Sequence, residues 1–322
     1  MNLRDIHIPV LLERCVELLG PALRHAQEAG RSAVYVDGTL GMGGHSEAFL
    51  ERFPHIQQVG LDRDPDALRI AGERLAPFAD RISLVHTVYD GIAEAVRAAG
   101  HDHADAILYD LGVSSLQLDE AERGFAYAQD APLDMRMDPT QGITAADVVA
   151  TYGEGDLRRI FERYGEEKLA GRYARAIIAA RQTTPITRSG QLVDILQSAT
   201  PAALKNAGHP AKRVFQALRI EVNGELAALE RAIPAALGTL AVGGRLVVLS
   251  YQSLEDRFVK RLFAEATTST APPGLPFELP EHAPQFRLLV KGAELASDEE
   301  AARNPRAKPV RLRAIERIKE AA

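Results

Sequence analysis

The sequence predicts a doubly wound α/β fold, in which a parallel sheet carries helices on both faces. Three observations support this. Four short apolar runs in the first third of the chain alternate with helical patterns. A glycine-rich turn follows the first run, and strand character returns near the C-terminus. Strands that alternate with helices of this length are typical of right-handed crossovers in a parallel sheet.

The predicted strands of the first third are residues 33–37, 58–62, 81–85 and 106–110. Helices are expected from about Ser46, over 65–75 and over 91–99. Pro65 suits the first turn of its helix, where the missing N–H costs nothing. Each strand therefore leads through a helix to the next strand.

After Val113 the alternation stops. Residues 118–212 contain several helical patterns and no clear strand, whereas 213–237 reads as one long helix. Three further strands are predicted at residues 245–249, 286–290 and 310–314. We therefore predict that residues 1–117 and 213–322 form the sheet domain, and that 118–212 are an inserted all-helical domain.

Composition limits the class of protein. The 322 residues are 46% hydrophobic and 25% charged, which is ordinary for a globular protein and far too apolar for a disordered one. No apolar run approaches the ~18–20 residues of a membrane span, and the N-terminal segment does not resemble a signal peptide. Cys15 is the single cysteine, which excludes internal disulfides and fits a reducing cytoplasm. We expect a cytoplasmic protein.

Positive charge is concentrated in two stretches of an otherwise acidic chain. Residues 157–219 hold 12 Lys or Arg and 4 Asp or Glu, and residues 303–319 hold 7 and 1. In the first stretch, Lys168, Arg172 and Arg175 share a helical face. These stretches could bind a polyanion, or they could simply be solvated helix faces, and charge alone does not decide between the two.

The most informative segment is residues 37–46, which contains four glycines in seven positions after the first strand. Such a loop lies at the carboxyl edge of the sheet, where doubly wound folds bind ligands. The dinucleotide pattern G-x-G-x-x-G fails because Ser46 stands where a glycine is needed, and no phosphate loop ending in G-K-[ST] is present. Asp37 would repel a pyrophosphate but suits a cationic amino group. The pattern favours S-adenosylmethionine.

Three further residues fit such a pocket. Asp62 ends the second strand, about 20 residues after the loop, where a carboxylate can accept hydrogen bonds from ribose hydroxyls. Tyr89 could stack on adenine or pack in the core. Asp110 ends the fourth strand, where it could face the reacting groups or cap the following loop.

Several segments resemble the bacterial 16S rRNA (cytosine-N4)-methyltransferase family. The matching residues are 7–12, 37–46, 62–65, 110–115, 117–119, 122–125, 132–139, 215–220, 253–257 and 304–307. They run nearly from end to end of the chain, and the run of eight from Pro132 to Pro139 is far more specific than a glycine loop.

The resemblance implies a class I S-adenosylmethionine-dependent fold with an antiparallel strand near the C-terminus and an inserted helical domain for RNA recognition. It implies methylation of the exocyclic N4 of one cytosine in the decoding region of 16S rRNA. The small ribosomal subunit is the expected partner, although the sequence leaves open whether the substrate is free 16S rRNA or the assembled subunit. No metal is expected. The cofactor contacts carried over from the family are Gly43, Gly44, His45, Asp62, Tyr89, Asp110 and Gln117.

Two positions depart from the family pattern. Gln252 stands where the family commonly has a histidine, which puts a proton-accepting imidazole there in doubt. Leu116 replaces a usual proline before Gln117.

For the chemistry, Asp110 is the best candidate to accept a hydrogen bond from the cytosine amine. Cys15 lies in an apolar helical pattern, which argues against methylation at cytosine C5 by a cysteine nucleophile. The alternate histidines His101 and His103 are read as exposed loop residues and not as metal ligands. Two rival classes stay open: a nicotinamide-dependent oxidoreductase, which the failed dinucleotide pattern weighs against, and a non-catalytic RNA-binding protein, which leaves the glycine loop unexplained.

Overall fold

The computed structural model describes residues 9–204, 208–272, 279 and 281–320, so His7 and Ile8 of the first matching segment lie outside it. The chain divides into two compact units. The sheet unit comprises Met1–Gly112 and Ala227–Ala322, and the helical unit comprises Val113–Leu226. The division thus lies at residues 112/113 and 226/227, whereas the sequence placed it at 117/118 and 212/213.

Among the described residues, seven strands form one sheet in the order β3-β2-β1-β4-β5-β7-β6. Their bounds are β1 Ala33–Asp37, β2 Ile56–Asp62, β3 Ile82–His86, β4 Ala104–Asp110, β5 Leu240–Ser250, β6 Phe286–Leu288 and β7 Arg311–Arg317. Strands β1 to β5 pair in parallel, and β7 is antiparallel to both β5 and β6. The predicted doubly wound fold, with its antiparallel strand near the C-terminus, is confirmed.

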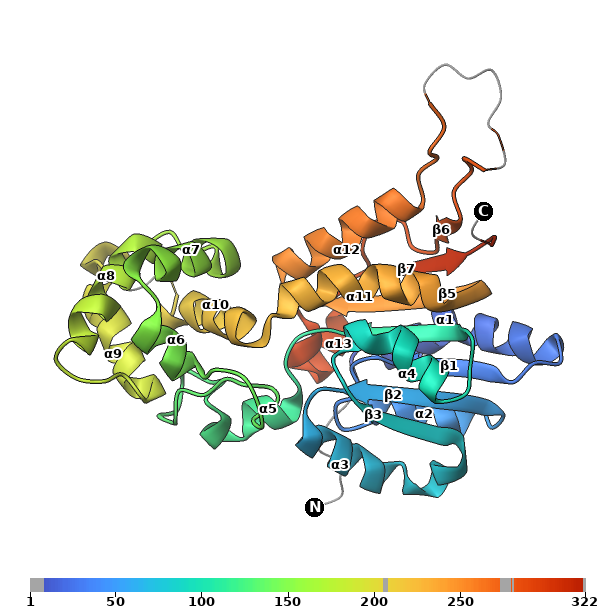
Figure 1. The fold of residues 1–322 in the computed structure, drawn as a ribbon, viewed down its shortest axis with the longest axis horizontal. Helices are drawn as coiled ribbons and strands as arrows, with labels where there is room; N and C mark the ends of the chain where they lie inside the picture. Colours follow the sequence, from blue (N-terminus) through green and yellow to red (C-terminus); the bar gives the residue numbers. More distant parts are fainter. Residues whose placement is uncertain (1–8, 205–207, 273–278, 280, 321–322) are drawn as a thin grey trace. The chain divides into compact units, whose positions relative to one another are not determined.

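Helices cover both faces of this sheet (Figure 1). On one face lie α1 (Leu12–Glu28), α2 (Gly44–Arg52) and α3 (Pro65–Arg74). On the other lie α4 (Ile92–Ala98), α11 (Glu225–Thr239) and α12 (Ser253–Ala266). Strand β4 is buried along almost its whole length, as expected of a central parallel strand with two covered faces.

In its described residues, the helical unit has five α-helices around its own apolar core, preceded by the short α5 (Ser115–Asp119). They are α6 Ala145–Thr151, α7 Glu154–Gly165, α8 Ala170–Arg181, α9 Ser189–Ala199 and α10 Ala211–Asn223. Figure 1 shows them in green to yellow.

The helix predicted over 213–237 is in fact two helices, α10 and α11. Gly224 ends α10 with φ 58°, a left-handed conformation that glycine adopts without a Cβ penalty. Val214, Phe215 and Leu218 of α10 are buried in the core of the helical unit, which explains why this unit extends beyond residue 212.

Outside these elements, the short α13 (Asp298–Arg303) leads towards β7, and the side chain of Glu300 accepts a hydrogen bond of 2.7 Å from the backbone N–H of Leu11. This bond joins the N-terminal part of the described chain to the segment before β7 within the sheet unit. In the part of the chain that the structure describes, no helix is long and apolar enough to cross a membrane.

Candidate active site

The loop between β1 and α2 is shaped by three glycines: Gly38 has no room for a side chain, and Gly41 and Gly43 have backbone conformations that side chains rarely adopt. A Cβ on Gly38 would lie 2.1 Å from Cε1 of Tyr109, so the ring of Tyr109 packs directly on the loop backbone. Gly41 and Gly43 have φ of 51° and 78°, in the left-handed region. Gly43 immediately precedes the first residue of α2, Gly44. The loop therefore exposes backbone at the carboxyl edge of the sheet.

The carboxylate of Asp37 forms hydrogen bonds within this loop. Its carboxylate accepts hydrogen bonds from the backbone N–H of Thr39 (3.3 Å) and the hydroxyl of Ser46 (2.7 Å), and the residue is 2% exposed. Burial raises the pKa of Asp37 to about 6, against the lowering effect of His45. Asp37 thus stabilises the turn. This role comes in addition to the contact with a cationic amino group that the sequence predicts.

Asp62 closes the same loop from the end of β2. Its two carboxylate oxygens accept the backbone N–H groups of Gly41 (2.7 Å) and Asp64 (2.9 Å). Burial raises the pKa of Asp62 to about 6. Each carboxylate oxygen has a second lone pair, so the group can still accept hydrogen bonds from ribose hydroxyls.

Tyr89 begins a short 3₁₀ turn, Tyr89–Gly91, just after β3. Its half-buried ring lies 5.4 Å from the ring of Tyr109 at an interplanar angle of 52°. The Tyr109 hydroxyl donates to the carbonyl of Tyr89 at 3.1 Å. The ring is therefore held in place by Tyr109, the side chain that also contacts Gly38.

Asp110 ends β4 with its side chain 19% exposed. Its Oδ1 accepts a hydrogen bond of 2.6 Å from the hydroxyl of Tyr251, and its backbone N–H donates to Oγ1 of Thr39. Burial raises the pKa of Asp110 to about 7, and the Tyr251 hydrogen bond opposes this rise. A carboxylate with a pKa near neutrality is suited to accept a proton in catalysis.

His45 lies beside Asp110. Its Nε2 donates to the carbonyl oxygen of Val10 (3.0 Å), since a carbonyl can only accept, and its Nδ1 lies 3.8 Å from Oδ2 of Asp110. Burial lowers the pKa of His45, against the raising effect of Asp37. The imidazole is therefore mainly neutral near pH 7, and its Nδ1 carries no proton.

The structure thus brings Gly43, Gly44, His45, Asp62, Tyr89 and Asp110 to one edge of the sheet unit. Gln117 belongs to the helical unit. There it forms a capping box with Ser114: its Oε1 accepts the Ser114 N–H at 3.1 Å, and its own N–H donates to the Ser114 hydroxyl at 3.3 Å. Its contact with a cofactor stays a prediction.

Tyr251 is the functional candidate that sequence reasoning missed. It follows β5 directly, and the available signal was a hydroxyl-bearing residue just after a strand that ends at the same edge as β4. The neighbouring Gln252, which replaces the family histidine, starts the turn into α12. The Glu255 carboxylate accepts the backbone N–H groups of Tyr251 (3.0 Å) and Gln252 (3.1 Å).

Two other groups have no part in the site. Cys15 is fully buried in α1, and burial raises the pKa of its thiol well above the usual value, as expected of a core residue. His101 and His103 lie in the loop before β4. Within the described residues, no group of three or more His, Cys, Asp or Glu could hold a metal ion.

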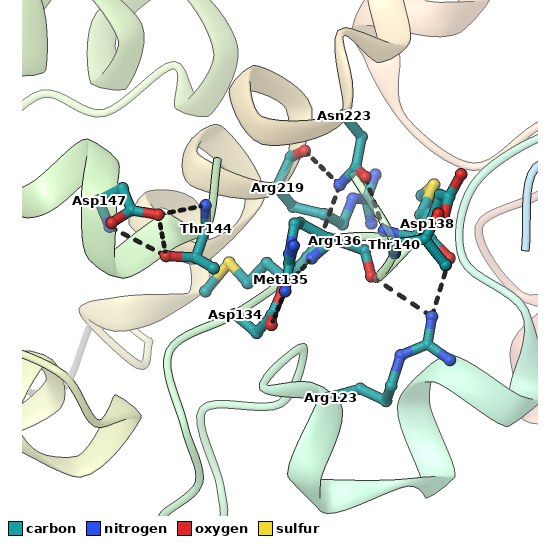
Figure 2. A network of polar contacts seen from close by, with 11 residues as sticks. Arg123, Asp134, Met135, Arg136, Asp138, Thr140, Thr144, Asp147, Arg219 and Asn223 are labelled. Carbon is teal, nitrogen blue, oxygen red and sulfur yellow. Dashed lines mark hydrogen bonds and ion pairs between the residues drawn. The ribbon is translucent and has the colours of Figure 1, made fainter. Parts of the chain in front are cut away.

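In the helical unit, the 132–139 segment forms a tightly bonded turn (Figure 2). Met135 has φ 62°, unusual for a residue with a side chain. Asn223 of α10 accepts the N–H of Met137 at 2.8 Å and donates to the carbonyl of Met135 at 2.8 Å. Arg123 donates to the Met137 carbonyl (2.9 Å), and Arg136 forms a two-pronged ion pair with Asp134 (2.8 Å for each bond).

Three basic side chains of the helical unit are exposed at and near α8. Lys168 precedes the helix, Arg175 lies 3.7 Å from Glu154, and Arg172 donates to the carbonyl of Ala199 at the end of α9. The C-terminal basic stretch is used differently. Arg313 pairs with Asp256 (2.8 Å) and Arg317 donates to the carbonyl of Leu240 (2.6 Å), so both stabilise β7 within the sheet unit.

Comparison with known proteins finds relatives that match almost the whole chain. The sequence pattern of the MraW methylase family matches residues 4–318. A protein of Leifsonia xyli named ribosomal RNA small subunit methyltransferase H is 69% identical over 98% of this chain and 95% of its own length. Proteins of the same name from Clavibacter michiganensis and Nocardia farcinica are 66% and 62% identical, over 99% and 98% of this chain and 99% and 97% of theirs.

Proposed function

The chain belongs to the MraW methylase family, and on this premise we propose that it transfers a methyl group from S-adenosyl-L-methionine to the exocyclic N4 of a cytosine in the decoding region of 16S rRNA. The observation that carries the proposal is the placement of Asp110. A partly exposed carboxylate ends β4 beside a glycine loop and a second carboxylate, Asp62, at the end of β2. The rRNA methyltransferases named above are similar to this chain along almost their whole length.

The loop residues fit the proposed cofactor. A Cβ at Gly38 is excluded by Tyr109, and Gly41 and Gly43 hold conformations that let the backbone approach a ligand closely. Asp62 supplies acceptor oxygens for ribose hydroxyls, and Tyr89 an aromatic surface for adenine. We also assign Gly44, His45, Asp110 and Gln117 to cofactor binding. When bound, S-adenosylmethionine supplies an electrophilic methyl group on a sulfonium.

The protein's own contribution is alignment and proton acceptance. Transfer to an amine needs nucleophile and leaving group in line. Cytosine N4 is a weak nucleophile because its lone pair is delocalised into the ring. A carboxylate that accepts a hydrogen bond from the N4 amine helps the nitrogen become pyramidal as it attacks, and we assign this role to Asp110. The base must leave its stack to reach such a site.

We assign RNA recognition to the helical unit, whose exposed basic side chains near α8 can contact phosphates. We propose that the substrate is 16S rRNA within the small ribosomal subunit and that the enzyme works in the cytoplasm, where this RNA is made.

The test is transfer of a labelled methyl group into small subunits that lack the modification, with free 16S rRNA as a parallel substrate and identification of the product nucleoside. We expect N4-methylcytidine in the assembled subunit. Asp110→Asn should lower turnover by roughly 10²-fold or more, while affinity for S-adenosylmethionine falls tenfold at most, about 1.4 kcal/mol. Label at cytosine C5, or no label in either RNA, would refute the proposal.

A further inference from the structure

Asp110 is held by one side chain that comes from the neighbouring strand. β4 and β5 pair in parallel with Asp110 opposite Leu249, so Tyr251 follows two residues beyond this pair. Its hydroxyl donates to Oδ1 of Asp110 at 2.6 Å. The phenol is therefore a donor to the carboxylate that the proposed reaction uses.

The position of Tyr251 is itself fixed. Its backbone N–H donates to the carboxylate of Glu255 at 3.0 Å, and its ring packs against the apolar core on the α1 face of the sheet. Gly112, with φ 102°, passes close above the ring, where a Cβ would lie 3.6 Å from Cδ2 of Tyr251. The hydroxyl is thus directed at Asp110 by contacts on several sides.

Other polar groups around Asp110 do not replace this bond. The groups that face it from the elements packed against it are Tyr35 and Asp37 of β1, His45 of α2, Cys15 of α1 and, beyond His45, Glu300 of α13. The Nδ1 of His45 is 3.8 Å from Oδ2, too far for a hydrogen bond, and the other ring nitrogen donates its proton to the carbonyl of Val10. Among the described side chains, Tyr251 alone donates to the Asp110 carboxylate.

We propose that Tyr251 is a positioning residue for methyl transfer: it holds Asp110 by Oδ1, so that Oδ2 is oriented to accept the proton that the cytosine amine loses. This role rests on the function proposed above. N4 forms a bond to the methyl carbon while the carbon–sulfur bond breaks and its electron pair goes to sulfur. One N4 proton passes to Oδ2 of Asp110, which becomes a neutral carboxyl and later releases the proton to water.

The hydrogen bond also sets the pH range in which Asp110 can act. Donation to the ionised carboxylate stabilises that form, so the loss of the donor raises the pKa of Asp110. The acceptor must be ionised, and the rate therefore rises with pH through this pKa. In Tyr251→Phe the midpoint of the rate profile should move to higher pH by about one unit, as expected for loss of a hydrogen bond to a charged group.

The experiment compares Tyr251→Phe with wild type in pH profiles of kcat, at saturating S-adenosylmethionine and small subunits. We expect at least about fivefold lower kcat at pH 7 from the shifted midpoint, only partial recovery near pH 9 because Asp110 is no longer held in place, and an unchanged KM for the cofactor. The matched control is Tyr35→Phe. This removes a hydroxyl from the same buried layer that has no hydrogen-bond partner, and the profile should stay that of the wild type.

A second measurement needs no RNA. Carboxyl ¹³C NMR of the free protein, assigned with Asp110→Asn, should report a higher pKa for Asp110 in Tyr251→Phe than in wild type and Tyr35→Phe. An unshifted titration, or a shifted titration with an unchanged rate profile, would overturn the positioning role in an active enzyme. A wild type that titrates as expected but transfers no methyl group would instead refute the proposed function, and this role with it.

Discussion

The side-chain amide of Asn223 donates a hydrogen bond of 2.8 Å to the carbonyl oxygen of Met135, a residue with φ 62° that lies 88 positions earlier in the chain. The same amide donates to the carbonyl of Arg219, and its oxygen accepts the N–H of Met137 (Figure 2). A residue with a side chain adopts this backbone conformation at an energetic cost, so the surrounding contacts must hold it. Asn223 supplies several of these contacts from α10.

Replacement of Asn223 by alanine should therefore destabilise the helical unit. The change leaves the buried N–H of Met137 and the carbonyl of Met135 without this partner, and each such loss costs about 1–3 kcal/mol. We expect the free energy of unfolding to fall by roughly 2–4 kcal/mol in urea titrations. Gln197→Ala on the exposed side of α9 is the control and should change it by less than about 0.5 kcal/mol. Equal stability of the two variants would contradict this account of the turn.

Asp62 should contribute to cofactor affinity through its charge. Asp62→Asn keeps only one carbonyl oxygen for the two backbone N–H groups that the carboxylate accepts, and it removes the negative charge offered to ribose hydroxyls. We expect S-adenosylmethionine binding to weaken by about 1.5–3 kcal/mol in calorimetry, the range for hydrogen bonds to a charged group. Glu73→Gln, an exposed carboxylate of α3, is the matched control. Unchanged affinity in a folded Asp62→Asn protein would rule out the ribose assignment.

Asp110 should make the folded state less stable as the pH rises. Its pKa is about 7 in the folded chain and about 3.9 when unfolded, so between these values the folded state binds more protons. Its contribution to stability is thus present at low pH and lost as the pH rises from about 4 to 7. Asp110→Asn removes this loss.

The stability difference between pH 4.5 and pH 8 should therefore be smaller in Asp110→Asn than in wild type, by roughly 2–4 kcal/mol in urea titrations. Asp194→Asn, on the exposed face of α9, should keep the wild-type dependence. Parallel pH profiles of wild type and Asp110→Asn would show that the carboxyl is not perturbed.

The exposed basic side chains near α8 should determine the salt dependence of RNA binding. Lys168 and Arg175 are better targets than Arg172, because Arg172 also bonds the end of α9. The plot of log K for association against log salt has a negative slope. In Lys168→Ala/Arg175→Ala this slope should become shallower by about 1.4, at roughly 0.7 for each single-strand phosphate contact. Filter binding of small subunits at several salt concentrations measures this slope.

Cofactor affinity should not change in that double variant. Arg97→Ala, which removes an exposed arginine paired with Glu94 in the sheet unit, should leave the slope unchanged. If the double variant binds like the wild type at every salt concentration, the basic face is merely solvated.

Much of the site could be predicted because it depends on local pattern. Asp62 and Asp110 each end a strand, and the carboxyl ends of parallel strands meet at one edge. Tyr251 could not be predicted in the same way. Its bond to Asp110 depends on β4 and β5 being neighbours in a particular register, across 141 positions of the chain.

The break between α10 and α11 was hidden for a different reason. A glycine inside a helical pattern is compatible with an uninterrupted helix, so the Asn223-Gly224 pair, although typical of a turn, did not by itself mark an end. The φ of Gly224 and the burial of Phe215 within the helical unit decide the matter, and both are properties of the folded chain.

The interrupted sheet has a consequence for how the chain is made. Strand β4 ends at Asp110 and its neighbour β5 begins at Leu240, so the ribosome must synthesise the whole helical unit between them. At about 5–20 residues per second, this takes roughly 6–26 s, during which one edge of a central strand has no partner. The helical unit ends at Leu226 and can fold during this interval. Asp110 and Tyr251 therefore meet only when most of the protein has been translated.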